Sequence, residues 1–455
     1  MEEDFFNNEL IEGFEQMLDN RESKYYDSED LVEIIEFYIE VNDSEYAKRA
    51  LEFAEKMHPD NLDIKIKRIE YLLFTENLKG AGKLIQELSD IAAKEIDYLL
   101  VQARFWGLKN MPRKAIRFYE QALQIDDEET DFICNCIGNE YLNLDEVHSA
   151  IVAFKRALKF NSENDYSFYS IIQSYEEIND KDDCIEFLKE YIEENPYSEI
   201  AWLQLGLLHN NKKQYHEAID AFDFVIAINP TSIVAQTNKA HSLEELGQLN
   251  AAIEVLEETL EFDDSPASTH LKIGELFEKL EKPQKALRSY HLSIKEDPQL
   301  DKAWAKTASL YDKIANYDEA EYYINRAIEL DNTNPDYYSN VIYYYLKQMK
   351  FEEAVKNLER LVELKPLVFN TWYAYVETLI AIGEYDQALA VLIGGALKNF
   401  NRAEFFYQLS NVYYLTDQDK LGEEALVNAL SLDRSLKDEM LENYPILKEK
   451  IKLVN

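Results

Sequence analysis

Residues 199–232 read EIAWLQLGLLHNNKKQYHEAIDAFDFVIAINPTS, and this stretch decides the fold of the chain. Trp202 and Gly206 stand four residues apart, which predicts one face of a first helix. After a short polar turn, Ala218 and Phe222 repeat that spacing and predict the packed face of a second helix. Because Gly206 and Ala218 are small, the two helices can approach closely, and Trp202 and Phe222 fill the space around the contact. The stretch therefore predicts a helix-turn-helix unit.

A small residue at the position of Ala218 recurs along the chain every 34 residues, with one step of 35. The series runs Ala47, Ala81, Ala115, Ala150, Cys184, Ala218, Ala252, Ala286, Ala320, Ala354, Ala388 and Gly422. A fixed period of this length is the signature of stacked helix pairs. Such an array is more often a binding surface than a reaction vessel, because its stacked repeats form an extended surface.

These helix pairs resemble the tetratricopeptide repeat, or TPR. An aromatic residue stands early in the first helix at Phe168, Trp202, Trp304, Tyr338, Trp372 and Phe406, although Lys65, Gln236 and His270 replace it elsewhere. A small residue follows four positions later, as at Gly138, Gly206 and Gly274, and a proline ends the repeat at Pro59, Pro196, Pro230, Pro298 and Pro366. The resemblance implies an all-α, right-handed superhelical solenoid of tandem helix-turn-helix repeats.

The register accommodates twelve repeats in residues 28–436. We expect them to begin near Ser28, Leu62, Ile96, Asp131, Asp165, Glu199, Ile233, Ala267, Asp301, Pro335, Phe369 and Ala403. Residues 1–27 then form an N-terminal capping helix, with its apolar face in 5–19, and residues 437–455 form C-terminal capping helices. The alternative is that one end docks a partner or a second copy, which would make the protein a homo-oligomer through its solenoid ends.

The composition excludes several classes of partner. A net charge of −41 argues against nucleic acid and against an anionic membrane surface. It favours solubility and basic partners, and the alternative is that Glu and Asp simply solvate the outer helix faces. No segment has the length of a membrane span, and the acidic start lacks the features of a signal peptide. Cys134, Cys136 and Cys184 form no disulfide framework, so we expect a cytoplasmic protein. High Asn, Ile, Tyr and Glu with little Gly suggests a bacterial source.

The sequence contains no pattern typical of an active site. It has no glycine-rich phosphate loop, and its seven histidines form no metal-binding cluster. Cys134 and Cys136 would point about 200° apart on a helix, which is a poor geometry for a metal. We therefore predict no enzyme, no catalytic residue, no metal and no cofactor.

The groove of the solenoid is the candidate binding site. In TPR arrays the first helices line this groove, and the resemblance assigns the second, fifth, ninth and twelfth positions of each repeat to it. In repeats four to six the candidates are Asn135, Asn139, Tyr166, Tyr169, Gln173 and Asn210, with Phe132 beside them. Amide side chains can pair with the N–H and C=O groups of an extended peptide, and aromatic rings add apolar contact.

A second candidate cluster near the C-terminus comprises Tyr343, Tyr373, Tyr407, Asn411 and Tyr414. Between the clusters, Glu244, Glu275, Glu278 and Asp312 predict an acidic stretch, partly offset by Lys302 and Lys313, where a basic segment could lie. The alternative for both clusters is an ordinary solvated surface, because the chain has 31 tyrosines.

These residues predict a non-catalytic scaffold or adaptor that binds a protein or peptide segment with basic and apolar residues. The carboxylate clamp of chaperone-binding TPR domains is absent, because no fifth position is Lys. The alternative function is a regulatory or accessory subunit that assembles through its ends with itself or with an enzyme complex.

Overall fold

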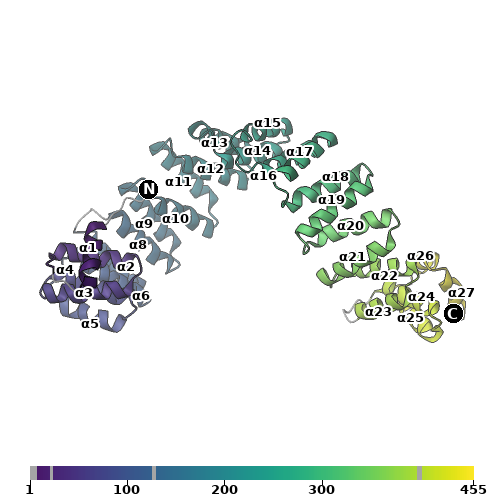
Figure 1. Ribbon diagram of the computed structural model, residues 1–455, viewed down its shortest axis with the longest axis horizontal. Coiled ribbons are helices and arrows are strands. Elements are labelled where there is room, and N and C mark those ends of the chain that lie inside the picture. The colour runs from purple at the N-terminus through teal and green to yellow at the C-terminus, as the bar shows by residue number, and fades with distance from the viewer. Residues whose placement is uncertain (1–7, 21–23, 126–129, 397–401, 455) are drawn as a thin grey trace. The chain divides into compact units, whose positions relative to one another are not determined.

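The computed structural model describes residues 8–20, 24–125, 130–396 and 402–454 (Figure 1). Within these ranges every regular element is a helix and there is no β-strand. The chain divides into two compact units, residues 1–191 and 192–455. The boundary falls inside α11 (Lys181–Glu194), and each unit is described separately.

Unit 1 consists of helices joined by short turns. They are α1 (Asn8–Asn20), α2 (Ser28–Glu40), α3 (Ser44–Met57), α4 (Leu62–Phe74), α5 (Leu78–Leu88), α6 (Ile96–Leu108), α7 (Pro112–Ala122), α8 (Thr130–Leu142), α9 (Val147–Phe160), α10 (Asp165–Glu177) and most of α11.

Unit 2 continues in the same way. It contains α12 (Glu199–Asn211), α13 (Tyr215–Ile228), α14 (Ile233–Glu245), α15 (Leu249–Thr259), α16 (Ala267–Lys279), α17 (Pro283–Glu296), α18 (Asp301–Lys313), α19 (Tyr317–Leu330), α20 (Pro335–Lys347), α21 (Phe351–Leu364), α22 (Phe369–Ile382), α23 (Tyr385–Ala396), α24 (Ala403–Leu415), α25 (Asp419–Leu432), α26 (Lys437–Asn443) and α27 (Pro445–Val454).

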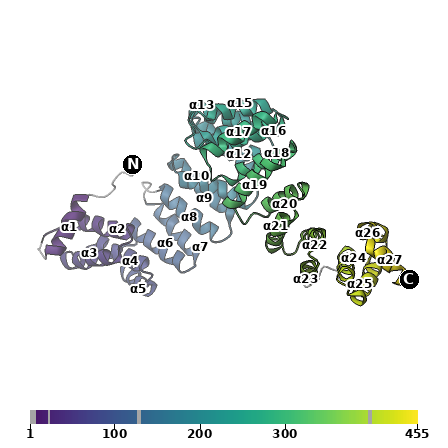
Figure 2. The ribbon, with the colours of Figure 1, turned by 45° about the vertical axis from the view of Figure 1, so that its right-hand side comes forward.

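Helices α2 to α25 form twelve consecutive pairs within the described residues. The first helix of each pair begins at the residue predicted from the period, except that α8 begins at Thr130 instead of Asp131. In each unit neighbouring pairs lie side by side, as both views show for α6 to α10 in unit 1 (Figures 1 and 2). The fold is thus an all-α array of helical hairpins.

The turn inside each pair has one geometry. A residue one to three positions after the end of the first helix lies in the left-handed region in all twelve pairs, at Asn42, Glu76, Asn110, Asp145, Asn179, Lys213, Gly247, Glu281, Ala315, Met349, Gly383 and Asp417. In one example, the Lys350 amide donates to the Tyr345 carbonyl at 2.9 Å, a bond that closes the end of a helix. Only two of the twelve residues are glycine, so the stacking of the pairs imposes this turn on most of them.

Contact between the two helices of a pair depends on a missing side chain. A Cβ on Gly138, Gly206 or Gly274 would lie 2.4–2.5 Å from the Cε1 atom of Phe154, Phe222 or Tyr290 respectively. Each aromatic ring therefore lies directly on the backbone of the facing helix. Its position explains why a small residue recurs there.

Successive pairs are joined by a repeated hydrogen bond. The indole nitrogens of Trp202, Trp304 and Trp372 donate to the carbonyl oxygens of Pro196, Pro298 and Pro366 at 2.9–3.0 Å. Gln236 stands where the aromatic residue is missing, and its amide donates to the Pro230 carbonyl at 2.9 Å. The Trp202 ring stacks on Phe224 with centroids 4.1 Å apart. It also packs against the buried cluster that contains Ala218 and Phe222, as predicted.

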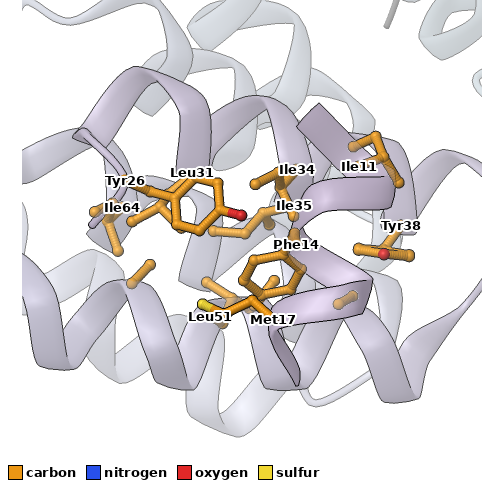
Figure 3. Packing of buried hydrophobic residues seen from close by; sticks show 13 residues of the cluster. Ile11, Phe14, Met17, Tyr26, Leu31, Ile34, Ile35, Tyr38, Leu51 and Ile64 are labelled. Atoms are coloured by element: carbon orange, nitrogen blue, oxygen red, sulfur yellow. The ribbon is translucent and has the colours of Figure 1, made fainter. Parts of the chain in front are cut away.

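Helices beyond the twelve pairs lie at both ends of the described chain. Phe14 of α1 is fully buried against Tyr26 and α2, and Figure 3 shows this cluster. The amphipathic helix predicted over residues 5–19 appears as α1 from Asn8 onward, and residues 5–7 lie outside the described residues. We propose that residues 1–27 and 437–455 cap the array and that residues 28–436 form one continuous array. No helix in the described chain is both long and apolar enough to cross a membrane.

Candidate functional site

Helices α8 and α10 of unit 1 present an aromatic surface to solvent. The exposed fractions of Phe132, Tyr166 and Tyr169 are 55%, 54% and 45%. Asn139 is half-buried and Gln173 is exposed on the same two helices. We call these five residues the α8–α10 surface. Large aromatic side chains that stay exposed in neighbouring repeats are a feature of interaction sites.

One hydrogen bond orders this surface. The Tyr166 hydroxyl donates to the Asn139 Oδ1 atom at 2.7 Å and so links α10 to α8. The Asn139 amide nitrogen and the whole Gln173 amide make no hydrogen bond to any residue in the described ranges. These amides remain available to pair with the backbone of a ligand.

Asn135 does not belong to the α8–α10 surface, and its prediction as a ligand contact is wrong. It is 8% exposed, and its Oδ1 atom accepts a hydrogen bond from the Ser167 hydroxyl at 2.6 Å. Its amide nitrogen donates to Asn164 at 3.4 Å, and Asn164 donates to Asp131 at 2.9 Å. Because the first turn of α10 packs over it, Asn135 joins two repeats instead of facing a ligand.

Asn210 lies in unit 2 and has a similar role. Its Oδ1 atom accepts a hydrogen bond from the Ser242 hydroxyl at 2.7 Å, which links α12 to α14. Its amide nitrogen is buried and has no hydrogen-bond partner among the described residues. Asn210 therefore joins two neighbouring repeats of unit 2.

The predicted acidic stretch of unit 2 is a ladder of ion pairs. Glu244 is 4% exposed and lies 2.8 Å from Lys272 and 2.7 Å from Lys279. One repeat later Glu275 lies 2.8 Å from Lys306, and Glu278 lies 2.5 Å from Lys313. These lysines neutralise Glu244, Glu275 and Glu278, which leaves no open site for a basic segment at these three residues, whereas Asp312 makes no ion pair in the described part of the chain.

The ion pairs shift the acidity of the carboxyl groups. Burial alone would raise the pKa of Glu244, but hydrogen bonds from Lys272 and Lys279 and their charges lower it below its ordinary value. At Glu278 burial alone would likewise raise the pKa, but Lys313 and the Tyr290 hydroxyl hold it below its ordinary value. Both groups stay ionised at neutral pH and hold successive repeats together.

The second predicted cluster is largely covered. Tyr343 is 44% exposed and Tyr373 is half-buried, but Tyr407, Asn411 and Tyr414 are 0%, 4% and 6% exposed. The last two helices of the described chain, α26 and α27, pack against α24 and α25 in both views (Figures 1 and 2). The prediction that these three residues project into an open groove is wrong, because all three are buried, and Tyr407 and Tyr414 pack in one cluster with Met440 and Leu447 of the C-terminal helices.

Tyr444, which directly follows α26, contacts residues two repeats earlier in the chain. Its hydroxyl donates to the Glu377 carboxylate and lies 3.3 Å from the hydroxyl of Tyr373, two repeats earlier. Burial, followed by the charge of Glu377, raises the pKa of Tyr444 far above its usual range. On α27, Lys450 pairs with Asp419 at 2.8 Å. The chain's own C-terminal helices therefore occupy the predicted groove positions of the last repeats.

No group of three His, Cys, Asp or Glu side chains in the described residues could hold a metal ion. The three cysteines form no disulfide, and burial raises the pKa of the Cys136 thiol to about 11 and of the Cys184 thiol to about 12. These thiols are protonated at neutral pH and are weak nucleophiles.

Comparison with family models gives two matches. Residues 200–232 and 233–266 match the model described as tetratricopeptide repeat. The chain is a tetratricopeptide-repeat protein. Residues 313–395 also match the model of anaphase-promoting complex, cyclosome, subunit 3. TPR arrays are scaffolds for protein interactions, and this TPR chain is a repeat scaffold of that kind.

Curated relatives of this TPR protein are distant. Anaphase-promoting complex subunit 3 of Schizosaccharomyces pombe is 21% identical over 193 residues, covering 42% of this chain and only 29% of that protein. A TPR repeat-containing protein of Methanocaldococcus jannaschii is 23% identical over 417 residues, covering 83% of this chain and 70% of that protein. A solved TPR structure from Cytophaga hutchinsonii covers 53% of this chain and 98% of its own, with 16% identity and a TM-score of 0.43.

Sequence reasoning named Lys313 but missed three other lysines of the ion-pair ladder, Lys272, Lys279 and Lys306, although the TPR register contains a signal for them. Lys272 and Lys306 stand 34 residues apart, as do Lys279 and Lys313. A lysine that recurs one repeat later beside a recurring glutamate indicates pairing between neighbouring repeats. The sequence has no comparable periodic pattern that predicts the burial of side chains in the last repeats by α26 and α27.

Proposed function

We propose that this protein is a non-catalytic adaptor that binds an apolar peptide segment of a partner protein on the α8–α10 surface. Exposure of Phe132, Tyr166 and Tyr169 is the observation that supports this most directly. In unit 2 the corresponding face is filled by ion pairs, and at its end by the chain's own helices. The α8–α10 surface thus combines exposed aromatic rings with the Gln173 amide and the Asn139 amide nitrogen, which make no hydrogen bond within the described residues.

The proposed recognition combines two kinds of contact. Side chains of the ligand pack on the rings of Phe132, Tyr166 and Tyr169, which lose little conformational entropy because each has two torsions. The backbone of an extended ligand pairs with the amides of Asn139 and Gln173. The paired carboxylates of unit 2 give no support for a basic segment. We therefore propose only that the bound peptide segment is apolar.

A pull-down followed by titration tests this proposal. The full chain and a Tyr166→Ser, Tyr169→Ser, Gln173→Ala variant are used to capture partners from cytosol, and peptides spanning the captured partner are then titrated directly. Two serine substitutions at Tyr25 and Phe160 provide the control, because these aromatics are also exposed in unit 1.

We expect the site variant to bind the partner peptide at least about tenfold more weakly, which corresponds to about 1.4 kcal/mol. The control variant should bind as the wild type does. Equal affinity of the site variant and the wild type would reject the α8–α10 surface as the site. Capture that is lost equally in both variants would indicate a general effect of surface aromatics.

A second function follows from the match of residues 313–395 to the anaphase-promoting complex subunit 3 model. We propose as the alternative an accessory subunit of a larger assembly, formed through the ends of the array with itself or with an enzyme. Light scattering tests self-association, because the monomer mass is 53.3 kDa. A mass that rises with concentration supports this alternative, and a constant monomer mass counts against self-assembly.

A further inference from the structure

Helices α5 and α6 of unit 1 border a cleft that none of the preceding sites uses. Its volume is about 460 Å³, and its rim carries Lys79, Lys83 and Lys109. None of the side chains that line the cleft is a carboxylate. In a chain with 88 acidic and 47 basic residues, a cleft lined by three lysines and no acid is an exception.

These lysines have no carboxylate partner in the described part of the chain. Lys79 and Lys83 make no ion pair there, and Lys109 lies instead 4.3 Å from the ring centroid of Phe105. Beside the cleft, the Nζ atom of Lys114 lies 4.0 Å from the ring centroid of Trp106. The side chains of all four lysines are exposed, and none of them makes an ion pair within the described residues.

The floor of the cleft is apolar. Gly82 faces Phe105 so closely that a Cβ on this glycine would lie 3.0 Å from the Phe105 Cζ atom. Trp106 is half-buried, and the hydroxyl of Tyr98 already donates to the Ile85 carbonyl at 2.5 Å. A ligand side chain placed on this floor therefore contacts aromatic carbon, while the surrounding ammonium groups attract negative charge.

We propose that the α5–α6 cleft binds an acidic segment of a partner protein that also carries an aromatic or aliphatic side chain. The apolar side chain packs between Gly82 and Trp106, and carboxylates on either side of it pair with Lys79, Lys83 and Lys109. Charge complementarity selects this occupant, because the cleft is locally cationic on a protein whose net charge is −41. This interaction is separate from the proposed peptide binding on the α8–α10 surface.

Selection from a phage-displayed dodecapeptide library on the immobilised full chain tests the proposal. Acidic peptides are repelled by the protein as a whole, so their enrichment requires a local cationic site. The variant is Lys79→Glu with Lys83→Glu. The control is Lys159→Glu with Lys189→Glu, which makes the same charge change at exposed lysines of the same unit.

We expect enriched peptides to combine Asp or Glu with an aromatic or aliphatic residue. The best peptide should bind the Lys79 and Lys83 variant more than tenfold more weakly, and the control variant as it binds the wild type. A Trp106→Leu substitution should weaken peptides that carry an aromatic residue. Variants of Tyr166 and Tyr169 should leave this affinity unchanged, which distinguishes the cleft from the α8–α10 surface.

Three outcomes would overturn the proposal. One is an enriched set without acidic residues, or no enrichment at all. Another is complete displacement of the peptide by an equal concentration of inorganic pyrophosphate, which would indicate a small-anion site. The third is concentration-dependent dimerisation that the Lys79 and Lys83 variant abolishes, because the occupant would then be a second copy of this chain.

Discussion

The ring of Phe222 lies directly on the Cα atom of Gly206, and a Cβ on this glycine would lie 2.5 Å from the Phe222 Cε1 atom. The same relationship joins Gly138 to Phe154 and Gly274 to Tyr290. Two helices of a pair are therefore held at a separation that only a glycine on the first helix permits at these positions.

Gly206→Ala should destabilise the protein in spite of the higher helix propensity of alanine. Propensity alone would stabilise the helix by about 1 kcal/mol, but overpacking costs about 1–3 kcal/mol. Gly394→Ala is the matched control, because its Cβ would meet Trp372 at an ordinary 3.5 Å. Urea unfolding followed by circular dichroism should give opposite shifts of the midpoint. A Gly206→Ala midpoint at or above the wild type would contradict the close contact.

Met349→Gly should stabilise the protein. Met349 has a φ of 56° and is 76% exposed, so glycine removes backbone strain and no packing. The left-handed conformation costs a non-glycine residue about 1–2 kcal/mol, and the greater chain entropy of glycine offsets part of the gain. We expect a net gain of about 0.5–1 kcal/mol in the free energy of unfolding, measured by thermal denaturation.

Gly383→Ala is the converse test of the turn. At a φ of 83° this glycine has no heavy atom within 4 Å of its Cβ position, so only the backbone responds. A loss of about 1 kcal/mol in unfolding free energy is expected from the left-handed conformation alone. If both Met349→Gly and Gly383→Ala were neutral, the turn would carry no strain.

Removal of residues 437–455 should expose Tyr407 and Tyr414. Because α26 and α27 bury these side chains, the truncated chain should bind more of an apolar dye and unfold at lower urea concentration. Tyr444→Phe isolates the hydroxyl contact with Glu377 and should cost about 1–2 kcal/mol. Unchanged dye binding after truncation would mean that these helices do not cover the last repeats in solution.

Acidification should weaken unit 2 through Glu244. Because the pKa of Glu244 is lower in the folded protein than its ordinary value, its stabilisation is fully present above about pH 4.3. It is lost as the pH falls through the lowered pKa. Glu244→Gln should cost about 1–3 kcal/mol at pH 7 and should reduce the loss of stability on acidification. Thermal midpoints from pH 7 to pH 3 measure this, with the exposed Glu257→Gln as the control. An acid response identical to that of wild type would contradict the prediction.

Much of the candidate site was within reach of the sequence. The repeat register placed Phe132, Tyr166 and Tyr169 on one face of neighbouring first helices, and the structure leaves all three exposed. It also placed Asn135 and Tyr407 at equivalent positions, yet both are buried. A position in the register fixes the direction of a side chain along its own helix. It contains no information on what the next repeat, or a later helix, places on top of it.

The sequence by itself determined the period and the starts of the first helices, because these depend on residues a fixed distance apart in one repeat. It also predicted a close approach of the helices at Gly206, but the structure places the Phe222 ring there. Only the tertiary structure decided that lysines neutralise Glu244 and Glu275 and that α26 and α27 cover the last repeats. Those outcomes depend on which charges and apolar faces meet across repeats. Ion pairing and burial are properties of such encounters in space, and the local pattern of residues does not specify them.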